Sequence, residues 1–489
     1  MIAPCPTPFN MAAYVLAAGA LSPDKIALEI LRANGAERWS FARLEAAVRG
    51  TGAGLAALGL RPGARVLLRM GNSVDFPLAY LGAIAVGLVP VPTSTALTGP
   101  EITAMAQDLS PALVIAGEDV TLPDHPAPVL TLERLRALRN LPPCAYDMGS
   151  PDRPAYIVFT SGSGGRPRAV VHAHRAVWAR RMMWEGWYGL RAHDRMMHAG
   201  AFNWTYTLGT GLMDPWAIGA TALVVEPGAP LGLLMRRHDA TIFAAVPGVY
   251  RQLLEGGKLR QMPHLRHGLS AGEKLPEATR TAWAAATGTE IFEALGMSEC
   301  STYISGSPAR PAPPGALGYP QDGRRVTVLE GDEGILAIHR DDPGLMLGYL
   351  GAGGLDLPLQ GEWFVTGDRV ARAEGGAITY LGRDDDMMNA GGFRVSPLEV
   401  ERALADHPEI DDIAVTDIDI RPDVRIIAAF YTAPQPLDEA ALNAFAAARL
   451  ARYKQPRLYR HLPRLPRGAN GKLSRRALRA LFKADDDKS

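Results

Sequence analysis

The sequence has few cysteines and no excess charge of either sign. Only three of its 489 residues are cysteine (Cys5, Cys144 and Cys300), and no two of them form a CxxC pair, so neither a zinc site nor a disulfide framework is indicated. Lysine plus arginine and aspartate plus glutamate number 51 each, which argues against a nucleic-acid scaffold or a polybasic membrane binder. We expect a cytoplasmic protein without a nucleic-acid partner, in which Cys300 is a small buried side chain rather than a nucleophile.

Long apolar runs are also missing. The stretch Met11–Leu21 is apolar, but no lysine or arginine precedes it, so it favours an N-terminal helix over a signal peptide. The stretch Tyr80–Val91 is too short to cross a bilayer and is interrupted by Gly82, Gly87 and Pro90. No transmembrane helix is predicted.

Strand and helix patterns alternate through the first two thirds of the chain. This alternation predicts a large layered α/β N-terminal domain built on parallel strands. We expect helices over Phe41–Leu58 (capped by Ser40), over Val74–Val86 and after His172, and strands at Val66–Met70, Val89–Pro92, Ala112–Ala116, Tyr156–Phe159, Thr221–Val225 and Thr241–Ala245.

A charged break at Arg383–Asp386 predicts a domain boundary. We expect an N-terminal domain over residues 1–382, a hinge over 383–386 and a small mobile α+β lid over 387–489. The lid pattern begins with a helix start in which Ser396 is the cap, followed by Pro397 and the capping-box acid Glu399. Strands at Ile413–Thr416 and Ile426–Tyr431 and a helix from Asp438 to Arg452 complete it.

The predicted strand at Tyr156–Phe159 runs into a loop of small residues. Glycine lets backbone N–H groups approach an anion, the hydroxyls of Thr160, Ser161 and Ser163 can donate to phosphate oxygens, and Arg168 adds a charged donor. Neither GxxxxGK[ST] nor GxGxxG occurs here, so this loop is neither a Walker A loop nor a dinucleotide-binding turn. On this segment alone, a phosphate loop with Gly162 at its centre and an ordinary surface loop stay equally open.

Five further motifs decide between these two interpretations. They occur in this order after the loop: Ser270-Ala271-Gly272-Glu273, Leu295-Gly296-Met297-Ser298-Glu299, Trp363-Phe364-Val365-Thr366-Gly367-Asp368, Tyr380-Leu381-Gly382-Arg383-Asp384-Asp385 and Pro466-Arg467-Gly468-Ala469-Asn470-Gly471-Lys472-Leu473. Together with the loop they resemble the motifs of the adenylate-forming (AMP-binding) enzymes, in family order and over nearly the whole chain. The branch that the sequence resembles is the benzoate-type and medium-chain acyl-CoA synthetases.

The resemblance implies how the nucleotide is bound. It places ATP and AMP against Thr160, Ser161, Gly162, Ser163, Arg168, Gly272, Glu273, Ser298, Asp368 and Arg383. Glu299 is implied to hold the Mg²⁺ that bridges the phosphates, a task suited to a carboxylate. Asp368 is implied to accept both ribose hydroxyls. Gly164, where a side-chain donor is usual, and Leu295, where an aromatic ring is usual, depart from the pattern and leave the affinity for ATP open.

The same resemblance assigns two tasks to the lid. Lys472 would offset charge on the carboxylate and the α-phosphate while the acyl-adenylate forms. The lid would then rotate about Asp385 and admit CoA past Gly391, Gly392 and Arg394. On this prediction Lys472 and Glu299 are the catalytic residues, ATP, Mg²⁺ and CoA are needed, and the oligomeric state, a homodimer included, is left open.

The acid is the least determined part. By resemblance the acyl pocket is built from Phe202, Asn203, Trp204, Tyr206, Thr207, Ala271, Met297, Ser301 and Thr302, and aromatic and hydroxyl side chains favour an aromatic or medium-length carboxylic acid. The predicted function is an AMP-forming carboxylate–CoA ligase. A stand-alone enzyme that loads a carrier protein, a non-catalytic acyl-nucleotide-binding protein and a luciferase-like oxygenase stay open as alternatives.

Overall fold

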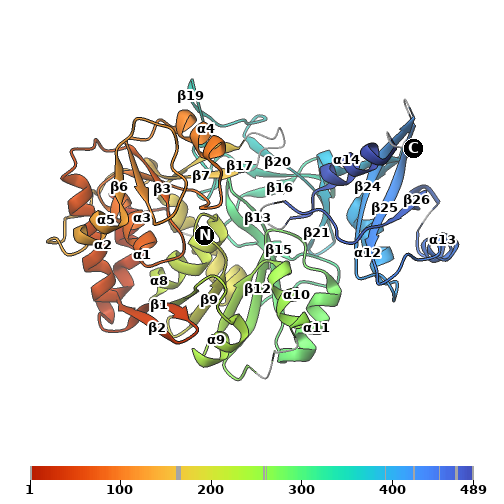
Figure 1. Ribbon diagram of the computed structural model, residues 1–489, viewed down its shortest axis with the longest axis horizontal. Helices are drawn as coiled ribbons and strands as arrows, with labels where there is room; N and C mark the ends of the chain where they lie inside the picture. The colour runs from red at the N-terminus through yellow and green to blue at the C-terminus, as the bar shows by residue number, and fades with distance from the viewer. Residues whose placement is uncertain are drawn as a thin grey trace. The chain divides into compact units, whose positions relative to one another are not determined.

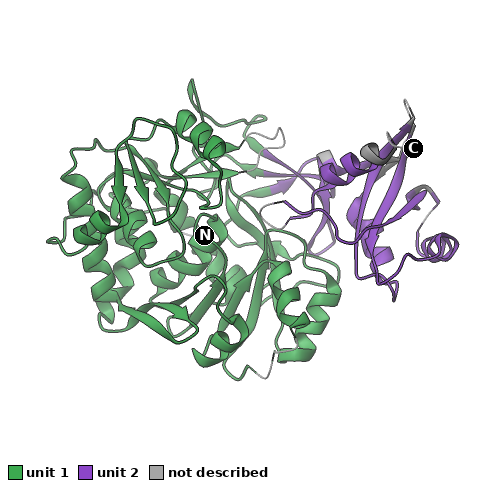
Figure 2. Cartoon of the chain, viewed as in Figure 1, with its two compact units in different colours: residues 1–326, 338–364 green, residues 327–337, 365–489 purple. Residues whose placement is uncertain are grey.

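The chain folds into two compact units. The computed structural model describes residues 3–160, 167–256, 259, 262–390, 393–421, 424–450, 452–468 and 472–486. Unit 1 comprises Met1–Val326 and Ile338–Phe364, and unit 2 comprises Thr327–Ala337 and Val365–Ser489 (Figure 2). The expected hinge at residues 383–386 lies inside unit 2, so the boundary at which the lid moves stays a prediction.

A nine-stranded sheet is the largest element of unit 1 (Figure 1). Its central strands β1, β10, β9, β11, β12 and β13 run parallel, and antiparallel strands flank them on both edges. The central strands are buried, as parallel strands covered on both faces should be. In sheet order the strands are β15 (Tyr319–Pro320), β14 (Ser301–Ser305), β13 (Ile291–Met297), β12 (His267–Ala271), β11 (Ile242–Ala245), β9 (Arg195–Ala199), β10 (Thr221–Val225), β1 (Ile26–Arg32) and β2 (Gly35–Ser40).

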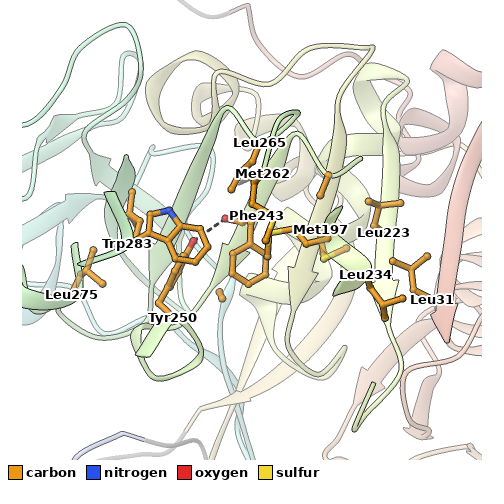
Figure 3. Packing of buried hydrophobic residues seen from close by; sticks show 14 residues of the cluster. Leu31, Met197, Leu223, Leu234, Phe243, Tyr250, Met262, Leu265, Leu275 and Trp283 are labelled. Carbon is orange, nitrogen blue, oxygen red and sulfur yellow. Dashed lines mark hydrogen bonds between the residues drawn. The ribbon is translucent and has the colours of Figure 1, made fainter. Parts of the chain in front are cut away.

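Alternate side chains of this sheet enter two different cores. Met197, Leu223 and Phe243 pack with Tyr250 of α10 (Pro247–Glu255) and Trp283 of α11 (Glu277–Thr287) (Figure 3). The Tyr250 hydroxyl donates to the carbonyl of Phe243 at 2.8 Å, and its ring meets that of Trp283 edge to face. The neighbouring residues of the same strands, such as Met196 and Ala244, enter the core of the opposite face. Because successive side chains point to opposite faces of the sheet, only every second residue of a strand can reach a site on a given face.

A second parallel sheet contains the strands predicted near the N-terminus. Its order is β4 (Val89–Pro92), β3 (Arg65–Arg69), β5 (Leu113–Ala116) and β6 (Val129–Thr131). Helices α2 (Phe41–Ala56) and α3 (Asp75–Ala85) confirm the two predicted helices. Ser40 caps α2 by accepting from the Arg43 amide at 3.3 Å, and Leu58 lies beyond the helix end and is 44% exposed. The predicted N-terminal helix is α1 (Met11–Leu16), which continues as a 3-10 turn.

Of a four-stranded antiparallel sheet, the sequence predicted one strand. The predicted strand before the small-residue loop is β7 (Pro154–Thr160), but the chain returns as a second strand, β8 (Arg168–Ala173), before helix α6 (Arg175–Ala179) begins. Strands β18 (Gly348–Gly351) and β19 (Gly354–Asp356), from much later in the chain, complete the sheet in the order β19–β18–β8–β7.

Unit 2 contains the small α+β fold expected near the C-terminus. Ser396 caps α12 (Pro397–Ala405) as predicted, and Asp438 caps α13 (Glu439–Ala447). Helix α13 is shorter than predicted, because residues Arg452–Lys454 form a separate 3-10 turn. The other elements of unit 2 begin with β16 (Val326–Val328), β17 (Glu333–His339), β20 (Trp363–Arg372) and β21 (Ile378–Arg383), of which the first three extend in part into unit 1. They continue with β22 (Met388–Ala390), β23 (Phe393–Val395), β24 (Asp412–Arg421), β25 (Val424–Thr432), β26 (Leu458–His461) and α14 (Arg475–Asp486).

Candidate active site

Four predicted site residues of unit 1 follow the carboxyl ends of parallel strands. Gly272 and Glu273 come directly after β12, and Ser298 and Glu299 come directly after β13, which pairs with β12. Ligands of open parallel sheets bind at this edge. Gly272 has a φ of +98°, a backbone conformation that a side chain would strain, so glycine is required for the turn after β12.

Glu299 is held in place by a residue that the sequence analysis did not single out. The hydroxyl of Tyr349, on β18, donates to Glu299 Oε1 at 2.7 Å, and both residues are buried. The Arg168 guanidinium carbon lies 3.2 Å from the centre of the same tyrosine ring, a cation–π contact. The Met346 amide also donates to the Glu299 carbonyl at 2.8 Å. The structure thus joins the predicted magnesium ligand to the predicted phosphate-loop arginine through one aromatic ring.

The two ends of the phosphate loop lie side by side. Thr160 and Arg168 are cross-strand partners in the β7–β8 hairpin. This pairing fixes where the predicted loop starts and ends. Ser161, Gly162 and Ser163 lie outside the described residues, so their predicted contacts with phosphate stay predictions.

Ser298 is anchored through its backbone. His172, on β8, makes a hydrogen bond of 2.7 Å from Nε2 to the Ser298 carbonyl and stacks on Tyr156. Burial lowers the pKa of His172 to about 4, so the imidazole is neutral near pH 7 and its Nε2–H is the donor. The turn that carries Ser298 and Glu299 is therefore tied to the strand that Arg168 begins.

The predicted acyl segment leaves β9 through a short loop held by Asn72. The Asn72 side chain donates to the Gly200 carbonyl at 2.7 Å and accepts from the Phe202 amide at 3.0 Å. Phe202 is buried against Phe76 of α3, with ring centres 5.1 Å apart. Asn203 and Trp204 are half-buried.

The remaining acyl candidates meet at the helix that follows. Tyr206, in α7 (Thr205–Leu208), donates to the Leu269 carbonyl at 3.1 Å and packs in the same buried core as Ala271. Met297 pairs with Ser301 across the β13–β14 ladder. Tyr206 and Ala271 therefore share one core, and the lining of an acyl pocket by these residues stays a prediction.

In unit 2 the structure brings Asp368 and Arg383 together. They are cross-strand partners on β20 and β21, and Arg383 Nη1 donates to Asp368 Oδ1 at 3.3 Å and to the Thr366 carbonyl at 2.8 Å. The Tyr380 hydroxyl donates to the same carboxylate oxygen at 3.3 Å, and burial raises the pKa of that tyrosine. Gly367 has a φ of +75°, and a β-carbon there would lie 2.8 Å from Arg383 Nη2, so glycine lets the arginine cross over the turn.

Lys472 ends a closed loop and has an exposed side chain. The Gly468 amide donates to the Lys472 carbonyl at 2.7 Å, and Arg467 forms a β-bridge with Leu473. Arg467 also donates to Asp412 of β24 at 2.9 Å, which fixes the loop on the small sheet. The lysine is therefore presented from an anchored turn.

The hinge and CoA predictions fall on sparsely described positions. Asp385 lies in the 3-10 turn Asp384–Asp386, but its side chain is outside the described part of the structure. The same is true of the Arg394 side chain, on β23, while Gly391 and Gly392 lie wholly outside. All four assignments stay predictions.

Of the three cysteines, Cys300 is buried, as predicted, and Cys5 and Cys144 are half-buried. Cys300 is enclosed, and burial raises the pKa of its thiol well above the usual range, which agrees with a structural side chain. Among the described residues, no three histidine, cysteine, aspartate or glutamate side chains are grouped to hold a metal. In the same part of the chain, no helix has the length and apolar character needed to cross a membrane.

Comparison with known proteins identifies the family. The family described as "AMP-binding enzyme" matches residues 16–350, and the family described as "AMP-binding enzyme C-terminal domain" matches residues 399–472. The chain belongs to the AMP-binding enzymes. The predicted adenylate-forming family and its α/β fold, with a large N-terminal domain and a small C-terminal one, are confirmed.

Named relatives of this adenylate-forming enzyme act on aromatic acids. It is 31% identical to the benzoate–CoA ligase of Thauera aromatica, over 96% of this chain and 92% of that protein, and 30% identical to the 4-hydroxybenzoate–CoA/benzoate–CoA ligase of Rhodopseudomonas palustris, over 90% and 89%. Among solved structures, the anthranilate CoA ligase AuaEII in complex with anthranoyl-AMP superposes with a TM-score of 0.88 at 25% identity, covering 98% and 99% of the two chains. A benzoate CoA ligase from Burkholderia xenovorans LB400 has a TM-score of 0.84 at 27% identity, covering 96% and 100%.

Proposed function

We propose that this enzyme is an ATP-dependent carboxylate–CoA ligase that acts on an aromatic acid through an acyl-adenylate. The arrangement of Arg168, Tyr349 and Glu299 carries the proposal. It sets a cation over the face of one ring and a carboxylate at the hydroxyl of the same ring, close to the strand ends where the phosphate loop begins. That pair of charges suits a triphosphate and its metal ion.

The described residues fit a magnesium ion shared with the nucleotide. Mg²⁺ in phosphate-transfer sites takes one or two carboxylates and completes its shell with water and phosphate oxygens. Glu299 offers one carboxylate, and the Tyr349 hydroxyl occupies only its Oε1. When bound, the ion would neutralise charge on the phosphates while the acid attacks the α-phosphorus.

The residues of unit 2 would serve the nucleoside and the reacting phosphate. Asp368, oriented by Arg383 and Tyr380, suits the two ribose hydroxyls, because a fixed carboxylate can accept both. Lys472 would supply the positive charge for the first half-reaction only. CoA would then displace AMP. We also propose, from the sequence, that the enzyme acts in the cytoplasm.

A panel of acids tests the proposal directly. Benzoate, hydroxybenzoates, 2-aminobenzoate, hexanoate and octanoate are each incubated with ATP, Mg²⁺ and CoA, and AMP release is measured. We expect AMP and acyl-CoA with at least one aromatic acid. Release of AMP only with a holo-carrier protein would assign the enzyme to the carrier-loading class, and no turnover with any acid would overturn the proposal.

The variant Lys472→Ala separates the two half-reactions. We expect ATP–pyrophosphate exchange to fall by roughly 100-fold or more, since a charged group that acts in the transition state is lost. Thioester formation from a supplied acyl-adenylate and CoA should be largely retained. Equal losses in both half-reactions would contradict the assignment of Lys472 to adenylation alone.

A further inference from the structure

A buried ion pair lies beside the proposed acyl pocket. Arg180 and Asp214 are 4% and 1% exposed, and the Arg180 guanidinium bonds both carboxylate oxygens, with Nη2 and Oδ2 2.6 Å apart. The Tyr188 hydroxyl also donates to Asp214 at 2.8 Å. Charges removed from water gain little net stability, so a buried pair of this kind is weak evidence for a purely stabilising role.

The pair directs one further bond at Ser301. Arg180 Nη1 donates to Ser301 Oγ and, among the described residues, makes no other hydrogen bond. Arg180 is itself fixed by close packing, because a β-carbon on Gly209 would lie 2.1 Å from its guanidinium carbon. The Ser301 oxygen is therefore occupied as an acceptor, and its hydrogen is left to donate. Among the described residues it donates to Met183 Sδ at 4.0 Å, and a thioether accepts only weakly.

The backbone of Ser301 is unusual as well. Its φ is +66°, which costs a residue other than glycine about 1 kcal/mol or more. The neighbouring turn is closed tightly, since a β-carbon on Gly296 would lie 2.4 Å from the Ser301 carbonyl oxygen. Strained residues of this kind collect at binding sites. Two independent observations, the directed arginine bond and the left-handed backbone, thus concern the same residue, Ser301.

The position of Ser301 connects it with the acid. It pairs with Met297 across the β13–β14 ladder, and Tyr188 of the ion-pair cluster packs in the same core as Ala271 and Tyr206. These three partners belong to the segments expected to form the acyl pocket. A hydroxyl whose oxygen accepts from a cation is also a stronger donor, because hydrogen bonds in a chain polarise one another.

We propose that Ser301, positioned by Arg180 and Asp214, is a specificity-determining residue that donates a hydrogen bond to an oxygen substituent on the aromatic ring. The preferred substrates are then hydroxybenzoates, not unsubstituted benzoate or an alkanoate. This inference rests on the proposed function and narrows its substrate class.

The test compares kcat/KM for benzoate and for 2-, 3- and 4-hydroxybenzoate. We expect the wild-type enzyme to prefer one hydroxybenzoate over benzoate, and Ser301→Ala to reduce that preference about tenfold, the loss of one hydrogen bond of about 1.4 kcal/mol. Ser301→Gly should reduce the preference equally while the fold is retained or stabilised, because glycine tolerates the positive φ. The matched control is Ser305→Ala, on the same strand β14, whose hydroxyl donates to the Gly186 carbonyl; its preference should match wild type.

A double variant examines the positioning pair. Arg180→Met with Asp214→Leu removes both charges together, so no unpaired charge is left buried. We expect KM for the preferred hydroxybenzoate to rise while kcat for benzoate changes little. If this variant does not fold, the two Ser301 variants still decide.

Three results would overturn the inference. These are equal use of benzoate and every hydroxybenzoate by the wild-type enzyme, turnover of alkanoates only, and an unchanged preference in both Ser301 variants. In each case CoA-dependent AMP release still supports the proposed function. Absence of AMP release with any acid would instead overturn the proposed function, and the inference with it.

Discussion

The Tyr349 hydroxyl is expected to control the adenylation step. It donates to Glu299 Oε1 at 2.7 Å in a buried setting. A hydrogen bond to a charged group contributes about 1.5–3 kcal/mol. Since 1.4 kcal/mol corresponds to about a tenfold rate change, Tyr349→Phe should slow adenylate formation by roughly 10- to 150-fold if Glu299 requires this orientation in the transition state.

The substitution is selective, because phenylalanine keeps the ring. The Arg168 guanidinium carbon lies 3.2 Å from the ring centre, and this cation–π contact should survive in Tyr349→Phe. Tyr349→Leu removes the contact, and we expect it to lose about 0.5–2 kcal/mol more interaction free energy than Tyr349→Phe. ATP–pyrophosphate exchange at several Mg²⁺ concentrations measures the effect, with thermal unfolding as a check on the fold. Exchange by Tyr349→Phe at the wild-type rate under limiting Mg²⁺ would refute the idea that this hydroxyl positions Glu299.

Three further changes follow from the structure. Gly367→Ala should raise KM for ATP about tenfold or more, because a β-carbon 2.8 Å from Arg383 Nη2 displaces the arginine from Asp368; an unchanged KM would contradict the ribose assignment. Burial lowers the pKa of His172 to about 4, so below pH 6.5 the unfolded chain binds more protons and acid favours unfolding. The free energy of unfolding, measured with urea, should be lower at pH 5 than at pH 7. His172→Gln should reduce this slope by up to about 1.4 kcal/mol per pH unit, and an unaltered slope would exclude this histidine as a contributor. Asp385→Pro should leave pyrophosphate exchange intact and slow thioester formation, whereas normal overall turnover would refute a hinge at this position.

Local pattern was sufficient for much of the fold. The short apolar runs that become β10 and β11, and the capped start of α12 at Ser396, are dictated by residues next to one another in the chain. The motifs around Gly272, Glu299 and Asp368 were found by their resemblance to the motifs of the family, whereas the strands β12, β13 and β20 that precede or carry them were not predicted. The order of the motifs in the chain was enough to predict the family.

Contacts between distant segments could not be predicted in this way. Tyr349 lies in a four-residue strand, and only pairing of β18 with β8 brings it to Arg168 and Glu299. Nothing in its neighbours signals that pairing. Arg180 and Asp214 gave no signal either, since isolated charges in a sequence are usually exposed, and their burial depends on packing around the turn at Gly209.

The β19–β18–β8–β7 sheet also has a consequence for how the chain is made. Synthesis runs from the N-terminus, and domains fold as their residues emerge. The Thr160–Arg168 hairpin emerges long before Gly348, so β8 must wait with an unpaired edge, and an open edge invites pairing with other chains. Until β18 arrives, the same delay leaves Glu299 without Tyr349. The proposed ATP-binding side of this enzyme is therefore completed late in synthesis, and we expect a chain truncated before Gly348 to be prone to aggregate.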